Sequence, residues 1–471
     1  MNSKVFSLHE VLAVARIHPF YSAQIQYPPD SKAIQNALDA AASDQAAPDF
    51  RLFPLTTKKQ LYKAIERLTA DTSPENTYRH SSYLSITGGG SGGLPMLFAT
   101  DAFENRVQRA RMGEFIRTCG LVGPGDWVLT THTSGHFYRS LDLTLEILEN
   151  AGASVLSAGN VMELAEVTAA LAHYRGNVLS GDGSQVIRAI HHIATLPAEE
   201  RKLIKIDKII YTSEPLTPAQ RAYVTHVLGP VKIYSLLGSS EAGPWALSCP
   251  DLTGDGPPEV PGAADFVFDT RTMRIEILDP SALDGGDDSA GEGGESLPDG
   301  SPGIIVQTSL QRLKNPLVRY VSGDIGSLHP LPELATTSGV IPLSELEHFR
   351  VLRLRGRDGR FSFKWYGMYF EFDKLAAFMQ AEERGILQWQ VVLASSESSP
   401  ELTLEVRVLV PSSNVGDAVA AKSELVKAIE DYFVVFPENT HLFLIKFVKD
   451  LTEFERSSTG GKVLHFIDRA H

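Results

Sequence analysis

The chain has 471 residues, two cysteines and a formal net charge of −14 at pH 7. Its length exceeds what one hydrophobic core usually supports, so we expect at least two domains. The acidic surface disfavours nucleic acid and anionic membranes as partners, and two cysteines are too few for a disulfide scaffold. Residues 1–20 hold only a short apolar run, which predicts no signal peptide or membrane span and a cytoplasmic protein.

The first part of the chain predicts a helical cap over residues 1–80, with helices at Leu8–Ala15 and Lys59–Thr69. From Tyr83 to about Tyr234, short apolar strands alternate with helical stretches, a pattern typical of a parallel α/β sheet. The strands are expected at Trp127–Thr131, Ser154–Ser157, Asn177–Ser180 and Lys208–Tyr211, and the helices at Leu141–Ala151, Met162–His173, Ser184–Ala194 and Pro218–Leu228.

The pattern changes after Asp265 to strands without intervening helices, expected at Phe266–Asp269, Arg274–Leu278 and Ile304–Thr308. A run of Gly, Asp, Ser and Glu at Ala282–Ser301 predicts a surface loop. A smaller α+β region follows, with strands at Trp389–Ala394 and Thr403–Leu409, a helix at Ala418–Phe433 and a last strand at Leu442–Val448. The predicted fold is therefore α/β, with a large N-terminal domain (residues 1–355) and a small C-terminal α+β domain (residues 356–471).

A glycine-rich run, Thr87-Gly88-Gly89-Gly90-Ser91-Gly92-Gly93, stands out in the first third of the chain. It matches the spacing of a dinucleotide fingerprint and of a hydrolase nucleophile elbow, but both need a helix directly afterwards, and residues 95–99 predict a strand. It lacks the Lys-Ser/Thr pair of a Walker loop. A turn between strands that folds over nucleotide phosphates remains, beside the alternative of a plain surface turn.

Gly90-Ser91-Gly92-Gly93-Leu94-Pro95 resembles the phosphate loop of the adenylate-forming superfamily, with Leu94 where that family usually has lysine. Other family segments follow in order. The similar stretches are Ser235 to Gly243 (magnesium and phosphate segment), Val318 to Asp324 (ribose segment), Leu354 to Arg360 (hinge), Lys364 to Gly367 (thiol loop) and Arg456 to Lys462 (catalytic lysine segment).

Three further segments resemble the phenylacetate-coenzyme A ligase branch of this superfamily. They are His18-Pro19-Phe20-Tyr21, Leu55-Thr56-Thr57-Lys58 and Ser213-Glu214-Pro215-Leu216. The resemblance thus covers nearly the whole chain and implies a large adenylate-forming domain followed by a mobile C-terminal domain.

The resemblance also implies roles for individual residues. Lys462 and Glu241 would be catalytic, with Glu241 binding Mg²⁺ because that ion prefers oxygen ligands. The acid pocket would be built after the strands of the parallel sheet, from His136, Phe137, Gly181 and Asp182. Lys364 and Gly367 would lie near the thiol. ATP or AMP would contact the glycine loop together with Ser213, Glu214, Pro215, Gly238, Ser239, Ser240, Asp324 and Arg357.

A metal site from His132 and His136 is less favoured, because no third ligand is apparent nearby. The implied activity is ATP-dependent activation of a carboxylic acid, in this branch an aryl or arylacetic acid, to an acyl-AMP and pyrophosphate. Transfer to a thiol would follow, with coenzyme A as co-substrate, or with a carrier-protein pantetheine or an amine as alternative acceptors. From a different class, Leu94 and Leu237, which replaces an adenine-stacking aromatic residue, leave open a nucleotide-binding regulatory protein. A serine hydrolase using Ser91 is a more distant alternative.

Overall fold

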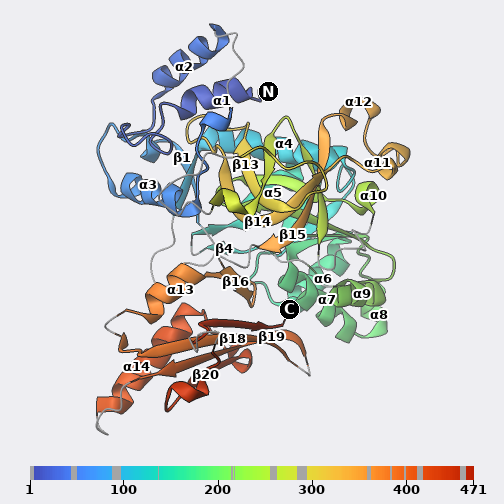
Figure 1. Cartoon of the computed structure of the whole chain (residues 1–471). Helices are drawn as coiled ribbons and strands as arrows, with labels where there is room; N and C mark the ends of the chain where they lie inside the picture. Colours follow the sequence, from blue (N-terminus) through green and yellow to red (C-terminus); the bar gives the residue numbers. More distant parts are fainter. Residues whose placement is uncertain are drawn as a thin grey trace. The chain divides into compact units, whose positions relative to one another are not determined.

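The computed structural model describes residues 5–43, 50–86, 97–135, 137–213, 216, 218–254, 263–283, 294–357, 362–381, 384–396, 399–410, 417–456 and 463–470. These residues form two compact units, which divide after Arg357 (Figure 1). In the described part of the chain, no helix combines the length and the apolar character that crossing a membrane requires.

The N-terminal helices begin at capping residues. Helix α1 (Leu8–Ala15) begins with a capping box, in which the side chain of Ser7 accepts a hydrogen bond from the Glu10 amide. Helix α3 (Lys58–Ala70) begins with the same motif at Thr57. Both helices were predicted from their apolar spacing. The sequence did not predict α2 (Ser31–Ser43), whose residues are mostly exposed. The short 3₁₀ helices η1 (Phe50–Leu52) and η2 (Thr77–Arg79) flank α3 in the chain.

A hairpin and a long helix follow. Strands β1 (Ser82–Ile86) and β2 (Leu97–Asp101) are antiparallel, and Ile86 pairs with Leu97. The glycine-rich run therefore joins two strands, as predicted. Asp101 then caps the unpredicted helix α4 (Ala102–Thr118). Apolar periodicity does not reveal this helix because part of its buried face is polar, including Gln108 and Arg111.

The first unit is built on one large sheet of eleven strands among the described residues. In order across the sheet they are β12 (Met273–Leu278), β13 (Gly303–Ser309), β14 (Tyr320–His329), β15 (Phe349–Arg357), β11 (Ala264–Asp269), β10 (Gly243–Ser248), β9 (Lys232–Ser239), β8 (Lys208–Thr212), β7 (Val178–Asp182), β3 (Trp127–Thr130) and β6 (Ser154–Ser157).

The portion from β9 to β6 is parallel, as the alternating sequence pattern predicts. Parallel strands need crossover connections, and helices supply them here. The helices of this portion are α5 (Ser140–Asn150), α6 (Leu164–Tyr174), α7 (Gly183–Thr195), α8 (Ala198–Arg201) and α9 (Pro218–Leu228). Two very short strands, β4 (Ser134–Gly135) and β5 (Tyr138–Arg139), pair with each other before α5.

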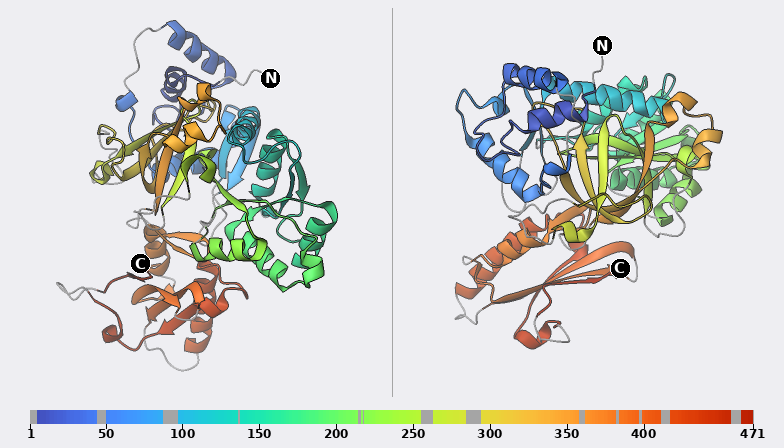
Figure 2. Two further views of the ribbon diagram at one scale, coloured as in Figure 1. Left: turned by 90° about the vertical axis from the view of Figure 1, so that its right-hand side faces the viewer. Right: turned by 45° about the horizontal axis from the view of Figure 1, so that its top comes forward.

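Helices cover both faces of the parallel portion (Figure 2). Successive strand residues point to opposite faces. Val128 and Ile210 pack in one core cluster with α4 and α5, whereas Leu129 and Ile209 pack in another with α6, α7 and α9. Each strand is therefore apolar on both faces, and its carboxyl end is the part that reaches the ligand-binding edge of such sheets.

The remaining strands of the sheet, β10 to β15, are antiparallel and confirm the predicted helix-poor region. Residues 284–293 of the predicted loop lie outside the described residues. Short helical segments lie between the strands of this antiparallel portion, namely α10 (Pro250–Thr253), η3 (Pro280–Leu283), α11 (Glu333–Thr337) and α12 (Leu343–Leu346).

The second unit is a four-stranded sheet in the order β20-β19-β18-β21 among the described residues. In its core, side chains of the sheet pack against those of α13 and α14, including Leu375 and Ile429. The strand predicted at Leu442–Val448 is present as β20, but it is not the last one, because β21 follows and pairs in parallel with β18. The elements are β16 (Ser362–Trp365), β17 (Met368–Glu371), α13 (Phe372–Met379), β18 (Gln388–Ser396), β19 (Ser399–Leu409), α14 (Asp417–Tyr432), η5 (Thr440–Leu442), β20 (Phe443–Phe447), η6 (Leu451–Glu453) and β21 (Phe466–Arg469).

Candidate active site

A polar network joins the carboxyl ends of strands β7 and β8. Asp182 Oδ1 accepts hydrogen bonds from Thr212 Oγ1 at 3.0 Å and from Ser213 Oγ at 2.9 Å. Ser213 has φ of 68°, a left-handed conformation that is uncommon for serine. The structure therefore brings together two of the predicted residues, Asp182 from the acid pocket and Ser213 from the nucleotide site.

His132 is fully buried behind this network and is neutral. Burial lowers its pKa to about 4, although the negative charge of Asp182 opposes the shift. Thr212 uses its proton on Asp182, so His132 Nε2 donates to Thr212 at 3.0 Å and Nδ1 accepts from Thr130 at 2.8 Å. Both ring nitrogens of His132 are thus engaged in hydrogen bonds. Among the described residues, no group of three or more His, Cys, Asp and Glu could hold a metal ion.

Aromatic side chains lie beside the network, on the segment after β3. The hydroxyl of Tyr138 hydrogen-bonds to Ser213, and burial raises its pKa, with a further contribution from the charge of Asp182. Phe137 has φ of 65° and is 69% exposed. Gly181 packs against Thr131 so closely that an added Cβ would overlap the Thr131 hydroxyl, which explains why a residue without a side chain is needed there.

Gly238 and Ser239 end strand β9, and Ser240 and Glu241 lie in the turn from β9 to β10. Ser239 Oγ accepts from the Ala242 amide at 3.0 Å and closes the turn. Ser240 Oγ donates to the carbonyl of Ile86 at 2.6 Å, while Ser85 Oγ donates to the carbonyl of Ser240 at 3.1 Å. Because Ile86 directly precedes Thr87, this turn is fastened to the strand from which the glycine-rich run begins.

Glu241 is only 6% exposed and is held by residues from other elements. Tyr62, on α3, donates to Glu241 Oε1 at 2.7 Å. Burial, and then the nearby carboxylate, raise the pKa of Tyr62 far above its ordinary value, so its proton stays on the phenol. The Glu241 carbonyl accepts from Arg312, and Gln108 donates to the next carbonyl, that of Ala242, at 2.9 Å.

This environment fits a magnesium ion held mainly by a nucleotide. Mg²⁺ in such sites takes one or two protein carboxylates and completes its shell with phosphate oxygens and water. Glu241 offers one carboxylate whose position Tyr62 fixes. Sequence reasoning missed Tyr62, Gln108 and Arg312. The only available signal was a polar or charged residue within a helix or after a strand, which is too common to single them out.

Asp324 lies on β14, opposite Arg357 on β15. The segment before it is rigidly attached to the cap, because the Thr56 amide donates to the Arg319 carbonyl at 2.9 Å. The Arg319 guanidinium is itself buried against Glu276, with Nη2 3.2 Å from Oε1. The peptide amide of Asp324 donates to Ser322 Oγ at 3.1 Å.

Lys364 and Gly367 belong to the β16–β17 hairpin of the second unit. Tyr366 and Gly367 form its two-residue turn, both with positive φ (45° and 80°), and a glycine suits the second position. Lys364 Nζ lies 5.4 Å from the centre of the Tyr369 ring. Several predicted site residues lie outside the described residues, namely Thr87 to Gly93, His136, Glu214, Pro215 and Lys462, and Arg357 is described for its backbone only.

No protein-family model matches the sequence, and no curated protein matches it. Solved structures do match over almost the whole chain. A 2-hydroxyisobutyryl-CoA ligase in complex with 2-HIB-AMP and CoA is 17% identical, with a TM-score of 0.65, and the match covers 98% of this chain and 87% of that one. The chain therefore shares the fold of this CoA ligase.

A second solved structure extends the comparison. An amide bond synthetase from Marinactinospora thermotolerans is 14% identical, with a TM-score of 0.53, and the match covers 97% of this chain and 92% of that one. The predicted fold class, a large α/β domain followed by a small α+β domain, is confirmed.

Proposed function

We propose that this protein activates a carboxylic acid with ATP and then transfers the acyl group to a thiol, that of coenzyme A. The observation that carries the proposal is the junction between the β9–β10 turn and strand β1. There, the Ser240 hydroxyl and the Ile86 carbonyl attach the turn bearing Glu241 to the base of the glycine-rich run. A phosphate-binding loop and a magnesium-binding carboxylate must be neighbours in any enzyme that acts on ATP.

The first step would form a bond between a carboxylate oxygen of the acid and the α-phosphorus of ATP. The bond from that phosphorus to the bridging oxygen breaks, and pyrophosphate leaves with the electron pair. Bound Mg²⁺ would neutralise phosphate charge, and Glu241 would hold it. Lys462 would place its ammonium group where negative charge develops, which lowers the barrier to attack between two anions.

Asp324 would bind the ribose. An ionised carboxylate has two acceptor oxygens and can accept from both ribose hydroxyls. The attachment of Thr56 to the Arg319 carbonyl supports this role, because it fixes the backbone that presents Asp324. Ser213 and Gly238 to Ser240, at the carboxyl ends of β8 and β9, would contact the AMP moiety, as ligands of open α/β sheets do.

In the second step, a thiolate would attack the acyl carbon, and AMP would leave as the carbon–oxygen bond breaks. Lys364 and Gly367, on the tight hairpin of the second unit, would lie beside the incoming thiol. One active site can serve both steps if the second unit rotates about the segment at Arg357.

We further propose an aryl or arylacetic acid as the substrate. The supporting residues are Phe137 and Tyr138, whose rings follow β3, together with Gly181 and Asp182 at the end of β7. The apolar ring of the acid would pack against the aromatic side chains, and the hydrogen-bonded residues around Asp182 would form the polar wall of the pocket.

The test is carboxylate-dependent exchange of labelled pyrophosphate into ATP, measured with a panel of acids. Exchange with at least one aryl acid, lost in Lys462→Ala and Glu241→Gln, is expected. Lys449→Ala, an exposed lysine of the same unit, is the matched control and should keep full exchange. Absence of exchange with every acid, or full exchange in Lys462→Ala, would contradict the proposal. Adding coenzyme A, a carrier-protein pantetheine or an amine to the productive reaction then identifies the acceptor.

A further inference from the structure

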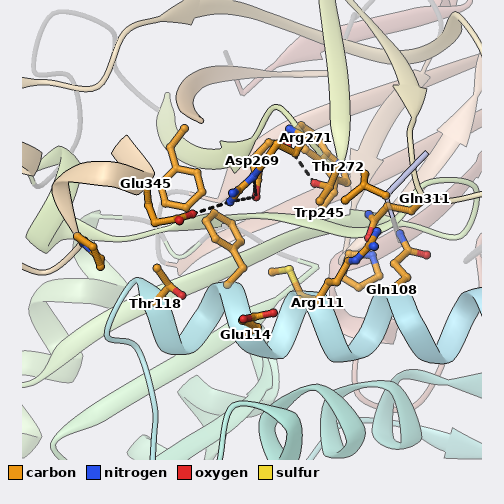
Figure 3. Close-up of a pocket in the computed structure, with 16 residues that line it drawn as sticks. Gln108, Arg111, Glu114, Thr118, Trp245, Asp269, Arg271, Thr272, Gln311 and Glu345 are labelled. Atoms are coloured by element: carbon orange, nitrogen blue, oxygen red, sulfur yellow. Dashed lines mark hydrogen bonds and ion pairs between the residues drawn. The ribbon is translucent and has the colours of Figure 1, made fainter. Parts of the chain in front are cut away.

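A cavity of about 400 Å³ lies in the first unit, between helix α4, the turn after β11, and helix α12 (Figure 3). Its size is within the range of small-molecule sites in proteins. Among the residues that line it, Gln108 also holds the β9–β10 turn through the Ala242 carbonyl, and the others play no part in the proposed nucleotide, acid or thiol sites. The proposed reaction therefore leaves this cavity without a role.

One end of the cavity holds buried polar atoms that lack partners. Arg111 projects from α4 toward Gln311 (Figure 3). Arg111 is 8% exposed, and its Nη1 and Nη2 have no hydrogen-bond partner within the described part of the chain. Gln311 is 5% exposed, and its Oε1 also lacks one there. Buried polar groups are nearly always hydrogen-bonded, so two donors and one acceptor are left for a bound molecule.

The other end of the cavity is already satisfied. Arg271 Nη2 lies 2.7 Å from Asp269 Oδ2 and 2.8 Å from Glu345 Oε2. The Arg271 side chain is 39% exposed, so this end opens to solvent. Burial lowers the pKa of Arg111, while the charges of Asp269 and Glu114 oppose the shift, and the guanidinium remains protonated.

The wall between the two ends is apolar. It is formed by Met112, Phe115, Trp245 and Phe349, and the rings of Phe115 and Phe349 are 5.2 Å apart between centroids. A ligand here would place a polar head at Arg111 and Gln311 and an apolar body against the aromatic rings.

We propose that this cavity binds a small amino acid-like molecule, a carboxylate with a hydrogen-bond donor beside it and an apolar side chain. The carboxylate oxygens would accept from Arg111 Nη1 and Nη2, a geometry for which a guanidinium is well suited. The adjacent amino group would donate to Gln311 Oε1. A phosphate dianion is disfavoured, because the carboxylates of Glu114, Asp269 and Glu345 line the same cavity and a zwitterion adds no net charge.

The experiment is isothermal titration calorimetry on the full chain without ATP, using three related probes. L-phenylalanine has both polar groups, 3-phenylpropionate lacks the amino group, and L-phenylalaninamide lacks the carboxylate. L-phenylalanine is expected to bind at least about 10-fold more tightly than either analogue, because each analogue leaves a buried group of the protein unpaired.

Arg111→Met should abolish binding of L-phenylalanine. The matched control is Arg106→Met, which removes an exposed arginine of the same helix outside the cavity and should leave binding unchanged. Gln311→Leu provides a second test if Arg111→Met does not fold. It should reduce the affinity for L-phenylalanine to that for 3-phenylpropionate. Absence of L-phenylalanine binding to the wild-type chain, or binding that survives Arg111→Met, would overturn the proposal.

Discussion

The phenol of Tyr62 donates a hydrogen bond of 2.7 Å to the carboxylate of Glu241, although the two residues are 179 positions apart. Helix α3 of the N-terminal cap therefore fixes the side chain that we expect to bind magnesium. Tyr62 belongs to the same core cluster as Tyr320, which begins the strand carrying Asp324. One buried tyrosine thus connects α3 with both segments for which we propose magnesium and ribose binding.

Tyr62→Phe should weaken magnesium binding and destabilise the first unit. Removing a buried donor to a carboxylate costs about 1–3 kcal/mol, and the freed carboxylate no longer keeps one position. We expect pyrophosphate exchange to need more Mg²⁺ for half-maximal rate. Tyr27→Phe is the control, because the Tyr27 hydroxyl donates to Asp71 on the surface, at 2.8 Å. Equal magnesium dependence in the two variants would refute this role of Tyr62.

Loss of the hydrogen bond between Ser240 and Ile86 should weaken nucleotide binding. Ser240→Ala removes the 2.6 Å hydrogen bond that attaches the β9–β10 turn to strand β1. The KM for ATP should rise by about 5-fold, since a hydrogen bond of this kind is worth about 1 kcal/mol. Ser82→Ala is the comparison, because Ser82 also lies on β1 but donates locally to the Tyr78 carbonyl. An unchanged KM in Ser240→Ala would show that the attachment does not position the nucleotide.

Stability should fall as the pH drops below 6.5, because buried histidines are neutral in the folded protein. Burial lowers the pKa of His132 to about 4 and that of His18 to about 3, from an ordinary value of 6.5. Between pH 6.5 and the folded pKa, the unfolded chain therefore binds a proton that the folded chain does not. Each such histidine then lowers the free energy of unfolding by up to about 1.4 kcal/mol for each pH unit of acidification. Below the folded pKa the histidine is protonated in both states and contributes no further change in stability with pH.

Urea denaturation followed by circular dichroism between pH 7 and pH 4.5 tests this dependence. His132→Gln should show a shallower loss of stability with acid than the wild-type chain. His173→Gln, at an exposed position on α6, should keep the wild-type slope. The assignment of a neutral buried His132 fails if all three slopes agree.

Gly181→Ala should damage the end of strand β7. The added Cβ would overlap the hydroxyl of Thr131, so that side chain or its surroundings must shift, at a cost of about 1–3 kcal/mol. Thr131→Ala in the same chain should restore part of the lost stability. Gly123→Ala meets no atom within 4 Å and should change the melting temperature little. Additive losses in the double variant would argue against the overlap.

The sequence predicts strands of the parallel sheet well, because they are apolar on both faces and are separated by helices. It fails for α4, where Asn105, Gln108, Arg109 and Arg111 are buried and break the apolar periodicity. It also fails for β21, which is only four residues long and depends on pairing with β18. Pairing with a distant strand thus determines β21, and burial of polar side chains hides α4 from its apolar pattern.

The same distinction applies to the candidate site. Resemblance predicts roles for Glu241 and Asp324 because each stands in a recognisable segment, and Asp182 is predicted from its place at the end of a strand. The residues that hold Glu241 come from elsewhere in the chain, and neither Tyr62 nor Arg312 stands in a segment of that kind. These two side chains contact Glu241 only because folding brings α3 and the segment after β13 to the β9–β10 turn.

The hairpin of β1 and β2 makes the glycine-rich segment a practical target for protein engineering. Ile86 and Leu97 are paired residues of adjacent strands, so the two ends of segment 87–96 are held at a fixed separation by the sheet. The entropy of closing a loop changes only slowly with its length, so this hairpin should accept segments of other lengths and sequences. Loops from other proteins of this fold could be exchanged between these two residues.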